Sequence, residues 1–274
     1  MSVTVPMPSK IIVSSTKALA DFVLHFSSKT TDQVRVARSL YALSLSGVDV
    51  NCNRFRIPLN NVLKGQRADG GWCDTEETAW CAALMRYKYE PEYPIVRSAT
   101  DWLKSVRRAT GGWSRHCRDG ARIPTTGLIS ALLPDIIEPS DIVWLTGEWR
   151  RDFEGPVRLS YKAGFVLLAM PEGNADALVE KTVEHLFKDQ NEDGGFGPWR
   201  NHPIGSDPWS TGVVLWGLSR WISMVDKAVV HKAVSWLERT QLPSGYWPYH
   251  YLDDGTSLAL IGIVSAMKAL ASIE

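Results

Sequence analysis

The stretch Asp74-Thr75-Glu76-Glu77 places three carboxylates within four residues, directly before an apolar run that starts at Thr78. Carboxylates clustered over an apolar surface cannot all ionise. The pKa of one of them should therefore rise and leave a proton available for general acid catalysis. The other interpretation is that Glu76 and Glu77 are first-turn acids that stabilise the start of a helix. The residues alone leave both interpretations open.

Further side chains that could bind a ligand lie in the later connections and on the helices that follow them. Arg115, Arg118 and Arg122 form a basic cluster that could hold a phosphate group. Asp, Cys and His occur together there, but no His-x-x-x-His or Cys-x-x-Cys pairs them, so we expect no metal and no cofactor. The candidate ligand-binding residues are Trp80, His116, Arg118, Arg122, Tyr161, His202, Trp209, Trp216, His250, Tyr251, Asp253 and Asp254.

A repeat places these side chains. Its copies begin at Gln66, Arg107, Gln190 and Gln241, so they are spaced by 41, 83 and 51 residues, and the doubled gap indicates a worn copy near Arg151. Each clear copy has glycine, then an aromatic residue, then a run that leads to threonine. Repeats of this period indicate an array of helices, either open or closed into a ring.

Apolar spacing predicts twelve helices in six pairs, each an amphipathic helix followed by a more apolar one. The pairs cover residues 15–27 and 31–45, 57–64 and 78–87, 94–107 and 126–133, 141–152 and 160–170, 175–189 and 211–222, and 226–239 and 256–272. An open solenoid needs polar capping repeats at its ends, yet the last helix is as apolar as the middle ones. We therefore expect an all-α (α/α)6 toroid or barrel, a single domain over residues 1–274 with the apolar helices inside.

Two positional expectations follow from the toroid. The threonines at positions 78, 126, 211 and 256 should start the inner helices. The long connections should gather on one rim, which places His116, His202 and His250 on the same face, with positive helix-dipole ends that favour anions. A polar mouth above an apolar cavity suits an amphiphilic small molecule.

The Gln-x-x-Asp-Gly-Gly-Trp/Phe copies that feed a Thr-Ala/Gly helix resemble the repeats of squalene and hopene cyclases, class II terpene cyclases and protein prenyltransferase β subunits. The resemblance spans residues 66–274 and implies the same toroid. Asp74-Thr75-Glu76-Glu77-Thr78-Ala79 looks like the Asp-x-Asp-Asp-Thr-Ala element of the class II cyclases. In that family the middle acid protonates an alkene or epoxide, which implies that Glu76 is the acid and that Asp74 and Glu77 are its partners.

The sequence departs from the family in several respects. Glu replaces Asp at the second and third acids, the link between Trp72 and Asp74 is shorter than expected in the cyclases, and there is one helical domain where the cyclases usually use two. Asp253-Asp254-Gly255-Thr256 resembles the zinc-ligand stretch of prenyltransferase β subunits, but Thr256 stands where that family has cysteine. A zinc site of that type is therefore not expected.

The resemblance implies a stand-alone terpenoid or meroterpenoid cyclase that protonates a prenyl chain in an apolar barrel cavity, where tryptophan faces stabilise cations. One alternative is a carbohydrate-active (α/α)6 enzyme with paired carboxylates, for which the separation of Glu76 and Asp254 is the discriminator. Another is a non-catalytic isoprenoid-binding protein or partner subunit that kept the fold and lost the chemistry.

Composition excludes several other classes. Thirty basic residues balance thirty acidic ones among 274, so no net field attracts nucleic acid. The four cysteines lack paired spacing, which favours a reduced, cytoplasmic setting. No apolar run reaches the roughly 18 residues of a membrane span, so we expect no transmembrane segment.

Overall fold

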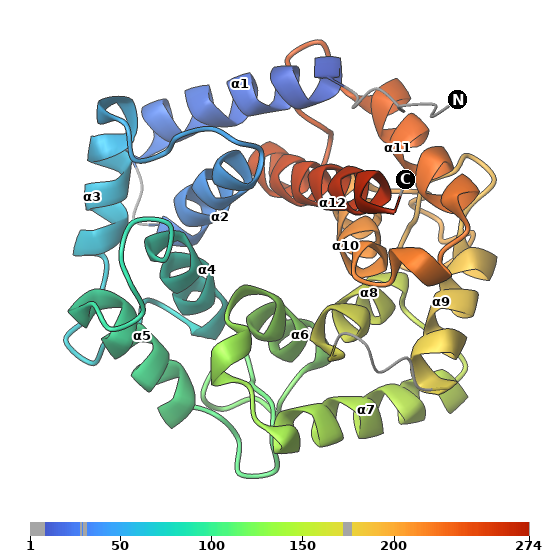
Figure 1. Cartoon of the computed structure of the whole chain (residues 1–274), viewed down its shortest axis with the longest axis horizontal. Helices are drawn as coiled ribbons and strands as arrows, with labels where there is room; N and C mark the ends of the chain where they lie inside the picture. Colours follow the sequence, from blue (N-terminus) through green and yellow to red (C-terminus); the bar gives the residue numbers. More distant parts are fainter. Residues whose placement is uncertain (1–8, 28, 30–31, 172–176, 274) are drawn as a thin grey trace. The chain divides into compact units, whose positions relative to one another are not determined.

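The computed structural model describes residues 9–27, 29, 32–171 and 177–273, and within them every regular element is a helix (Figure 1). The α-helices are α1 (Ser9–Phe26), α2 (Gln33–Leu45), α3 (Arg56–Lys64), α4 (Thr75–Met85), α5 (Pro94–Ser105), α6 (Ile123–Leu132), α7 (Pro139–Glu154), α8 (Ser160–Ala169), α9 (Ala177–Asp189), α10 (Pro208–Ser219), α11 (Lys227–Thr240) and α12 (Leu252–Ser272). Three short 3-10 helices join them: η1 (Asn53–Phe55), η2 (Pro134–Ile136) and η3 (Ile222–Met224). The twelve helices expected from the sequence are confirmed.

The chain divides into two compact units. One is Leu19–Glu148, and the other combines Met1–Ala18 with Trp149–Glu274. Helices α1 and α7 each contribute to both units. Nothing in the structure tests the single-domain expectation, which stays a prediction.

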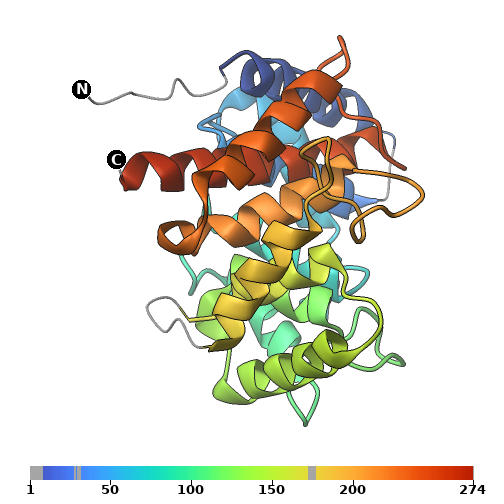
Figure 2. The same ribbon diagram turned by 90° about the vertical axis from the view of Figure 1, so that its right-hand side faces the viewer.

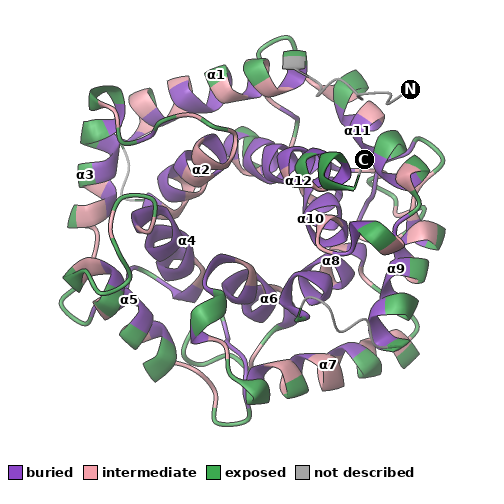
Figure 3. Cartoon of the chain, in the orientation of Figure 1, coloured by how far each residue is buried: buried purple, intermediate pink, exposed green. Residues whose placement is uncertain are grey.

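In the unit Leu19–Glu148, the apolar helices α2, α4 and α6 pack in succession, and α5 packs on α4. Every residue of α4 from Glu77 to Met85 is buried, because neighbours cover the helix on all sides. Amphipathic helices α3 and α5 keep one exposed stripe each, whereas burial covers most of α4 and α6 (Figure 3).

In the other unit, α10 packs against both α8 and α12 (Figure 2). Glycine makes the α10–α12 contact unusually close. A Cβ atom on Gly212 would lie 2.3 Å from the carbonyl oxygen of Leu258, and one on Gly262 would lie 2.3 Å from that of Gly212. These two helices therefore pack backbone against backbone.

Each repeat turn docks on the next amphipathic helix. Gly70 has a φ of 93°, and a Cβ there would lie 2.4 Å from the carbonyl oxygen of Ser98 in α5. The Gln66 side chain joins the turn to α5, because its Nε2 donates to the carbonyls of Gly70 in the turn (2.8 Å) and Ile95 in the helix (2.9 Å). The repeat glutamines Gln190 and Gln241 bridge in the same way, to Gly194 and Val229 and to Gly245 and Ile11.

The turn aromatic closes the motif. The indole N–H of Trp72 donates to the carbonyl of Val62 at the end of α3, 2.8 Å away. Trp113 and Trp247 make the equivalent bonds to Leu103 (2.7 Å) and Leu237 (2.8 Å). The tryptophans of the turns are therefore structural, as their place in the repeat suggests.

The expectation that the repeat threonines start the inner helices was wrong by about one turn. Helix α4 begins at Thr75, because the carboxylate of Asp74 accepts the Glu77 N–H (2.8 Å) and acts as the N-cap. The hydroxyl of Thr78 instead accepts the backbone N–H of Trp72 (2.8 Å). The same bond recurs from Trp113 to Thr126, from Phe196 to Thr211 and from Trp247 to Thr256.

Helix α12 corrects the expectation about apolar length. It has 21 residues and contains an 18-residue window with a mean hydropathy of 1.4, so by length and composition it could cross a membrane; no second helix in the described residues could. In the structure, 72% of its apolar window is buried. The core helix of a soluble protein passes the same test, so the finding is weak evidence for a membrane span.

Candidate functional site

The acid motif begins with a buried carboxylate that anchors the first turn of α4. Asp74 is only 8% exposed. Its Oδ1 accepts the Glu77 N–H, and its Oδ2 accepts Nε of Arg115 at 3.0 Å. The backbone carbonyl of Arg115 in turn accepts the Thr75 N–H at 3.2 Å. Asp74 thus joins the start of α4 to the connection before α6.

Glu76 is the accessible member of the motif. Its side chain is 27% exposed. Oε1 accepts the hydroxyl of Thr125 in α6 at 3.0 Å, and Oε2 lies 3.8 Å from Nε of Arg115. The carboxylate is therefore oriented by one hydroxyl and one guanidinium and still has an open side.

Glu77 is buried, at 7% exposure, and faces α2. Its carboxylate accepts the backbone N–H groups of Val34 and Cys73, which favour ionisation. Burial, together with the negative charges of Asp74 and Asp32, outweighs these bonds and raises the pKa of Glu77 to about 7. A carboxyl group that keeps its proton near neutral pH is therefore present in the motif. It is the third acid and not the middle one.

Arg115 contacts the acids, and the sequence analysis did not predict this contact. It lies 41 residues after Asp74, and 41 is also the spacing of the first two repeat copies. Equivalent positions of adjacent repeats lie side by side in a helical array. The repeat period itself was the signal that could have paired them.

Aromatic side chains gather around Trp209 in the unit that contains α8 and α10; we call this group the aromatic cluster. The ring of Trp209 lies 5.5 Å from Tyr161, edge to face, and 6.0 Å from Phe165. Tyr249 is nearly parallel to it, at 6.3 Å and an interplanar angle of 6°. Tyr161 and Trp209 were predicted; Tyr249 and Phe165 carry no distinctive sequence pattern and were missed.

The other predicted tryptophans lie in the packed interior. Trp80 and Trp216 are both buried, and Trp80 makes an edge contact with Tyr41 of α2 at 5.4 Å. Core packing accounts for that contact. Their roles in ligand binding stay predictions.

The predicted polar residues of the connections are mostly exposed, but some have structural partners. His202 lies edge-on to Trp199 at 4.1 Å, and its Nδ1 accepts the Ile204 N–H. Asp253 is buried in the first turn of α12. The exposed residues are His116, Arg118, Arg122, His250 and Tyr251, and Asp254 is half-buried.

The expected common face of the three histidines joins residues of both units and stays a prediction. Among the described residues, no group of three or more histidine, cysteine, aspartate or glutamate side chains could hold a metal ion. All four cysteines are free thiols.

No protein-family model matches the chain. Squalene–hopene cyclase of Zymomonas mobilis is 23% identical over 212 residues, which cover 71% of this chain and 29% of that cyclase. The chain therefore spans less than a third of the length of that relative.

Solved structures resemble the chain over nearly its whole length. The type II terpene cyclase MstE from Scytonema has a TM-score of 0.72 and 16% identity, with 95% of this chain and 99% of that chain covered. A variant of MstE in complex with geranylgeranyl dihydroxybenzoate gives 0.73 and 15%, with 95% and 98% covered. An α-amylase from Clostridium perfringens is less similar, with a TM-score of 0.55, 10% identity and 86% and 85% covered. The resemblance to the terpene cyclase superfamily and the all-α fold class are confirmed.

Proposed function

We propose that the chain is an isoprenoid cyclase of the class II type, which starts ring formation by protonating a prenyl chain. The observation that carries this proposal is the cluster of three carboxylates at the start of α4, one of which has its pKa raised to about 7. A fold similar to that of MstE supports it. MstE matches over 99% of its length, so a single array of this size is compatible with the activity named for that protein.

Glu76 is the proposed proton donor, because it is the one acid of the three with an open side. The proton on Oε of Glu76 would be transferred to a C=C bond, leaving a carboxylate on Glu76 and a carbocation on the substrate. Thr125 and Arg115 would stabilise that carboxylate through the contacts they already make. Asp74 and Glu77 are positioning residues: the first orients Arg115, and the second keeps a proton beside the site.

The cation that forms needs electron-rich surroundings. Aromatic ring faces attract cations, and this is the role that the sequence predicts for the tryptophans. The substrate is then a hydrophobic small molecule with a prenyl chain, whose alkenes are the only part that must reach the acid.

The experiment is a substrate panel in heavy water. Purified protein is incubated with linear prenyl alcohols, prenyl diphosphates and prenylated aromatics. A class II reaction yields products with more rings, each with one solvent-derived deuterium at the protonated carbon. If cyclised products form without deuterium, the reaction starts by another route and the proton-donor proposal is wrong.

The fold resemblance to an α-amylase supports a second candidate, a carbohydrate-active enzyme that uses paired carboxylates. The feature that distinguishes this candidate is the distance between the carboxylates of Glu76 and Asp254. The two residues belong to different units, so that distance stays a prediction. A panel of oligosaccharides analysed for new reducing ends tests this candidate. Binding of prenyl compounds without any turnover would instead support a partner or binding subunit.

A further inference from the structure

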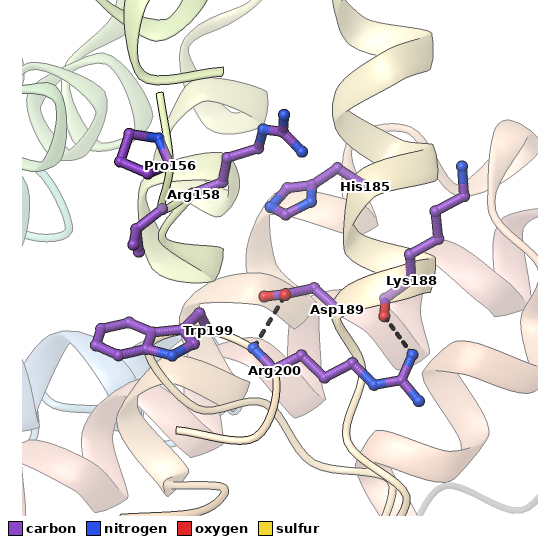
Figure 4. A pocket seen from close by; sticks show the side chains of 8 residues that line it. Pro156, Arg158, His185, Lys188, Asp189, Trp199 and Arg200 are labelled. Atoms are coloured by element: carbon purple, nitrogen blue, oxygen red, sulfur yellow. Dashed lines mark hydrogen bonds between the residues drawn. The ribbon is translucent and has the colours of Figure 1, made fainter. Parts of the chain in front are cut away.

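A surface pocket lies in the unit that contains α8 and α9 (Figure 4), and none of the residues that line it belongs to the acid motif. Its walls come from the segment before α8, the last two turns of α9 and the segment that follows the third clear repeat turn. Its volume is about 360 Å³. The residues that matter to the argument are Arg158, His185, Lys188, Asp189, Trp199 and Arg200.

A buried carboxylate ties the three walls together. Asp189 of α9 accepts the hydroxyl of Ser160, at the start of α8, and the backbone N–H of Arg200 at 3.0 Å. The Ser160 N–H also donates to the carbonyl of Pro198 at 2.8 Å. The pocket is therefore part of the packed structure, and both oxygens of its one acid are already engaged.

The cations around the pocket are held by the backbone and keep donors free. Nε of Arg158 donates to the carbonyl of Phe153 at 2.6 Å, and Nη1 of Arg200 donates to the carbonyl of Lys188 at 3.0 Å. Each guanidinium has five N–H donors, so most remain available. In the part of the chain that the structure describes, neither arginine has a carboxylate within 4.0 Å, whereas Lys188 pairs with the exposed Glu184 at 2.6 Å.

His185 adds a hydrogen-bonding group of a different kind. Its ring packs near Trp149 and Phe153, at 6.3 and 5.8 Å, and its buried Nε2 has no hydrogen-bond partner among the described residues. Burial lowers the pKa of His185, in spite of the nearby Asp189 charge. The imidazole is thus a neutral group with an unsatisfied ring nitrogen at the pocket, and a buried polar atom of that kind favours a ligand that bonds to it.

We propose that this pocket binds a phosphate ester, with the phosphate between Arg158, Lys188 and Arg200 and the organic part against the indole of Trp199. Three cations and one carboxylate line the pocket, and the pairing of Lys188 with Glu184 leaves an excess of one positive charge. The remaining N–H donors of Arg158 and Arg200, together with Nε2 of His185, suit the three acceptor oxygens of a phosphate monoester better than the two oxygens of a single carboxylate. The volume is about twelve times the ~30 Å³ share of a liquid water molecule, so a substituent fits beside the phosphate.

The site is independent of the proposed cyclase reaction, since none of its lining residues belongs to the acid motif or the aromatic cluster. The test is isothermal titration calorimetry with inorganic phosphate, phenyl phosphate and benzoate at low salt. We expect saturable binding of both phosphates and weaker binding of benzoate. Tighter binding of phenyl phosphate than of inorganic phosphate assigns the natural ligand to phosphate esters, whereas equal affinities assign it to free phosphate and overturn the role of Trp199.

Matched variants locate the site. Arg158→Gln and Arg200→Gln each remove one guanidinium, and each should weaken phenyl phosphate binding about ten- to a hundredfold, the worth of a charge-assisted hydrogen bond. Lys181→Gln is the control, because Lys181 is an exposed lysine of α9 and does not line the pocket. Circular dichroism checks that each variant is folded. Absence of saturable binding to the unaltered protein, or equal loss in Lys181→Gln, overturns the proposal.

Discussion

At the scale of single residues, the acid motif shows which properties of the carboxylates could be predicted from the sequence and which could not. Three clustered carboxylates predicted one raised pKa, and the structure places it on Glu77. The sequence could not decide which acid it was. The pKa of Glu77 is raised mainly by its burial and then by the negative charges of Asp74 and Asp32. Burial and the approach of Asp32, which is distant in the chain, arise only in the folded protein.

The raised pKa makes stability depend on pH. Glu77 has a folded pKa of about 7 and an ordinary value of 4.5, so the folded state holds the proton more tightly. The contribution of Glu77 to the free energy of unfolding is therefore fully present below about pH 4.5 and is lost as the pH rises through 7. Glu77→Gln should remove that dependence, which urea midpoints measured between pH 4.5 and 7.5 would show. Glu180→Gln, an exposed acid on α9, is the control and should keep the slope of the unaltered protein.

Arg115 should stabilise the fold through Asp74. Arg115→Met leaves a carboxylate that is 8% exposed without its guanidinium, so we expect the free energy of unfolding to fall by about 1–2 kcal/mol, less than for a fully buried pair because the arginine is half exposed. Arg118→Met removes an exposed arginine of the same connection and serves as the comparison. Equal effects of the two changes in urea unfolding would show that the Asp74–Arg115 pair contributes nothing of its own.

At the scale of elements, the repeat turn accounts for most of what was predictable. Glycine, an aromatic residue and apolar spacing predicted all twelve helices, because each signal is local. The starts of the four apolar helices that follow clear repeat turns were missed by about one turn, because threonine is a good N-cap residue and was taken as the start of each helix. In the structure, threonine accepts the N–H of the turn aromatic, a contact between residues up to 15 positions apart that no local rule contains.

The turn also predicts which substitutions it tolerates. Gly70→Ala forces a side chain onto a φ of 93° and 2.4 Å from the carbonyl of Ser98, so it should cost about 2–4 kcal/mol in urea unfolding. Trp72→Phe removes only the indole hydrogen bond to Val62 and some packing, so the free energy of unfolding should fall by about 1–2 kcal/mol. Phenylalanine already occupies this position in another copy of the repeat, at Phe196. Gly147→Ala is the control, since nothing lies within 4 Å of a Cβ there, and a loss there as large as that of Gly70→Ala would contradict this account.

At the scale of the whole molecule, the sequence was sufficient for the fold class and insufficient for the reaction. The last repeat turn docks on α1, where a Cβ on Gly245 would lie 2.3 Å from the carbonyl oxygen of Ser14 and the hydroxyl of Tyr246 donates to the carbonyl of Ala18 at 2.7 Å. Every clear copy therefore has the same kind of partner helix, which is why the pattern was so regular. The fold is also similar to that of an α-amylase, so the chemistry must be argued from the acid motif and not from the array.

The measurement that bears most directly on the proposed function is the turnover of Glu76→Gln with whichever prenyl substrate the panel identifies. Glutamine keeps the size of the side chain and can still accept from Thr125, but it has no acidic proton to donate. We expect turnover to fall by about two to four orders of magnitude, the usual effect of losing general acid catalysis, while the circular dichroism spectrum and the urea midpoint stay equal to those of the unaltered protein. Near wild-type turnover in Glu76→Gln would show that Glu76 is not the proton donor.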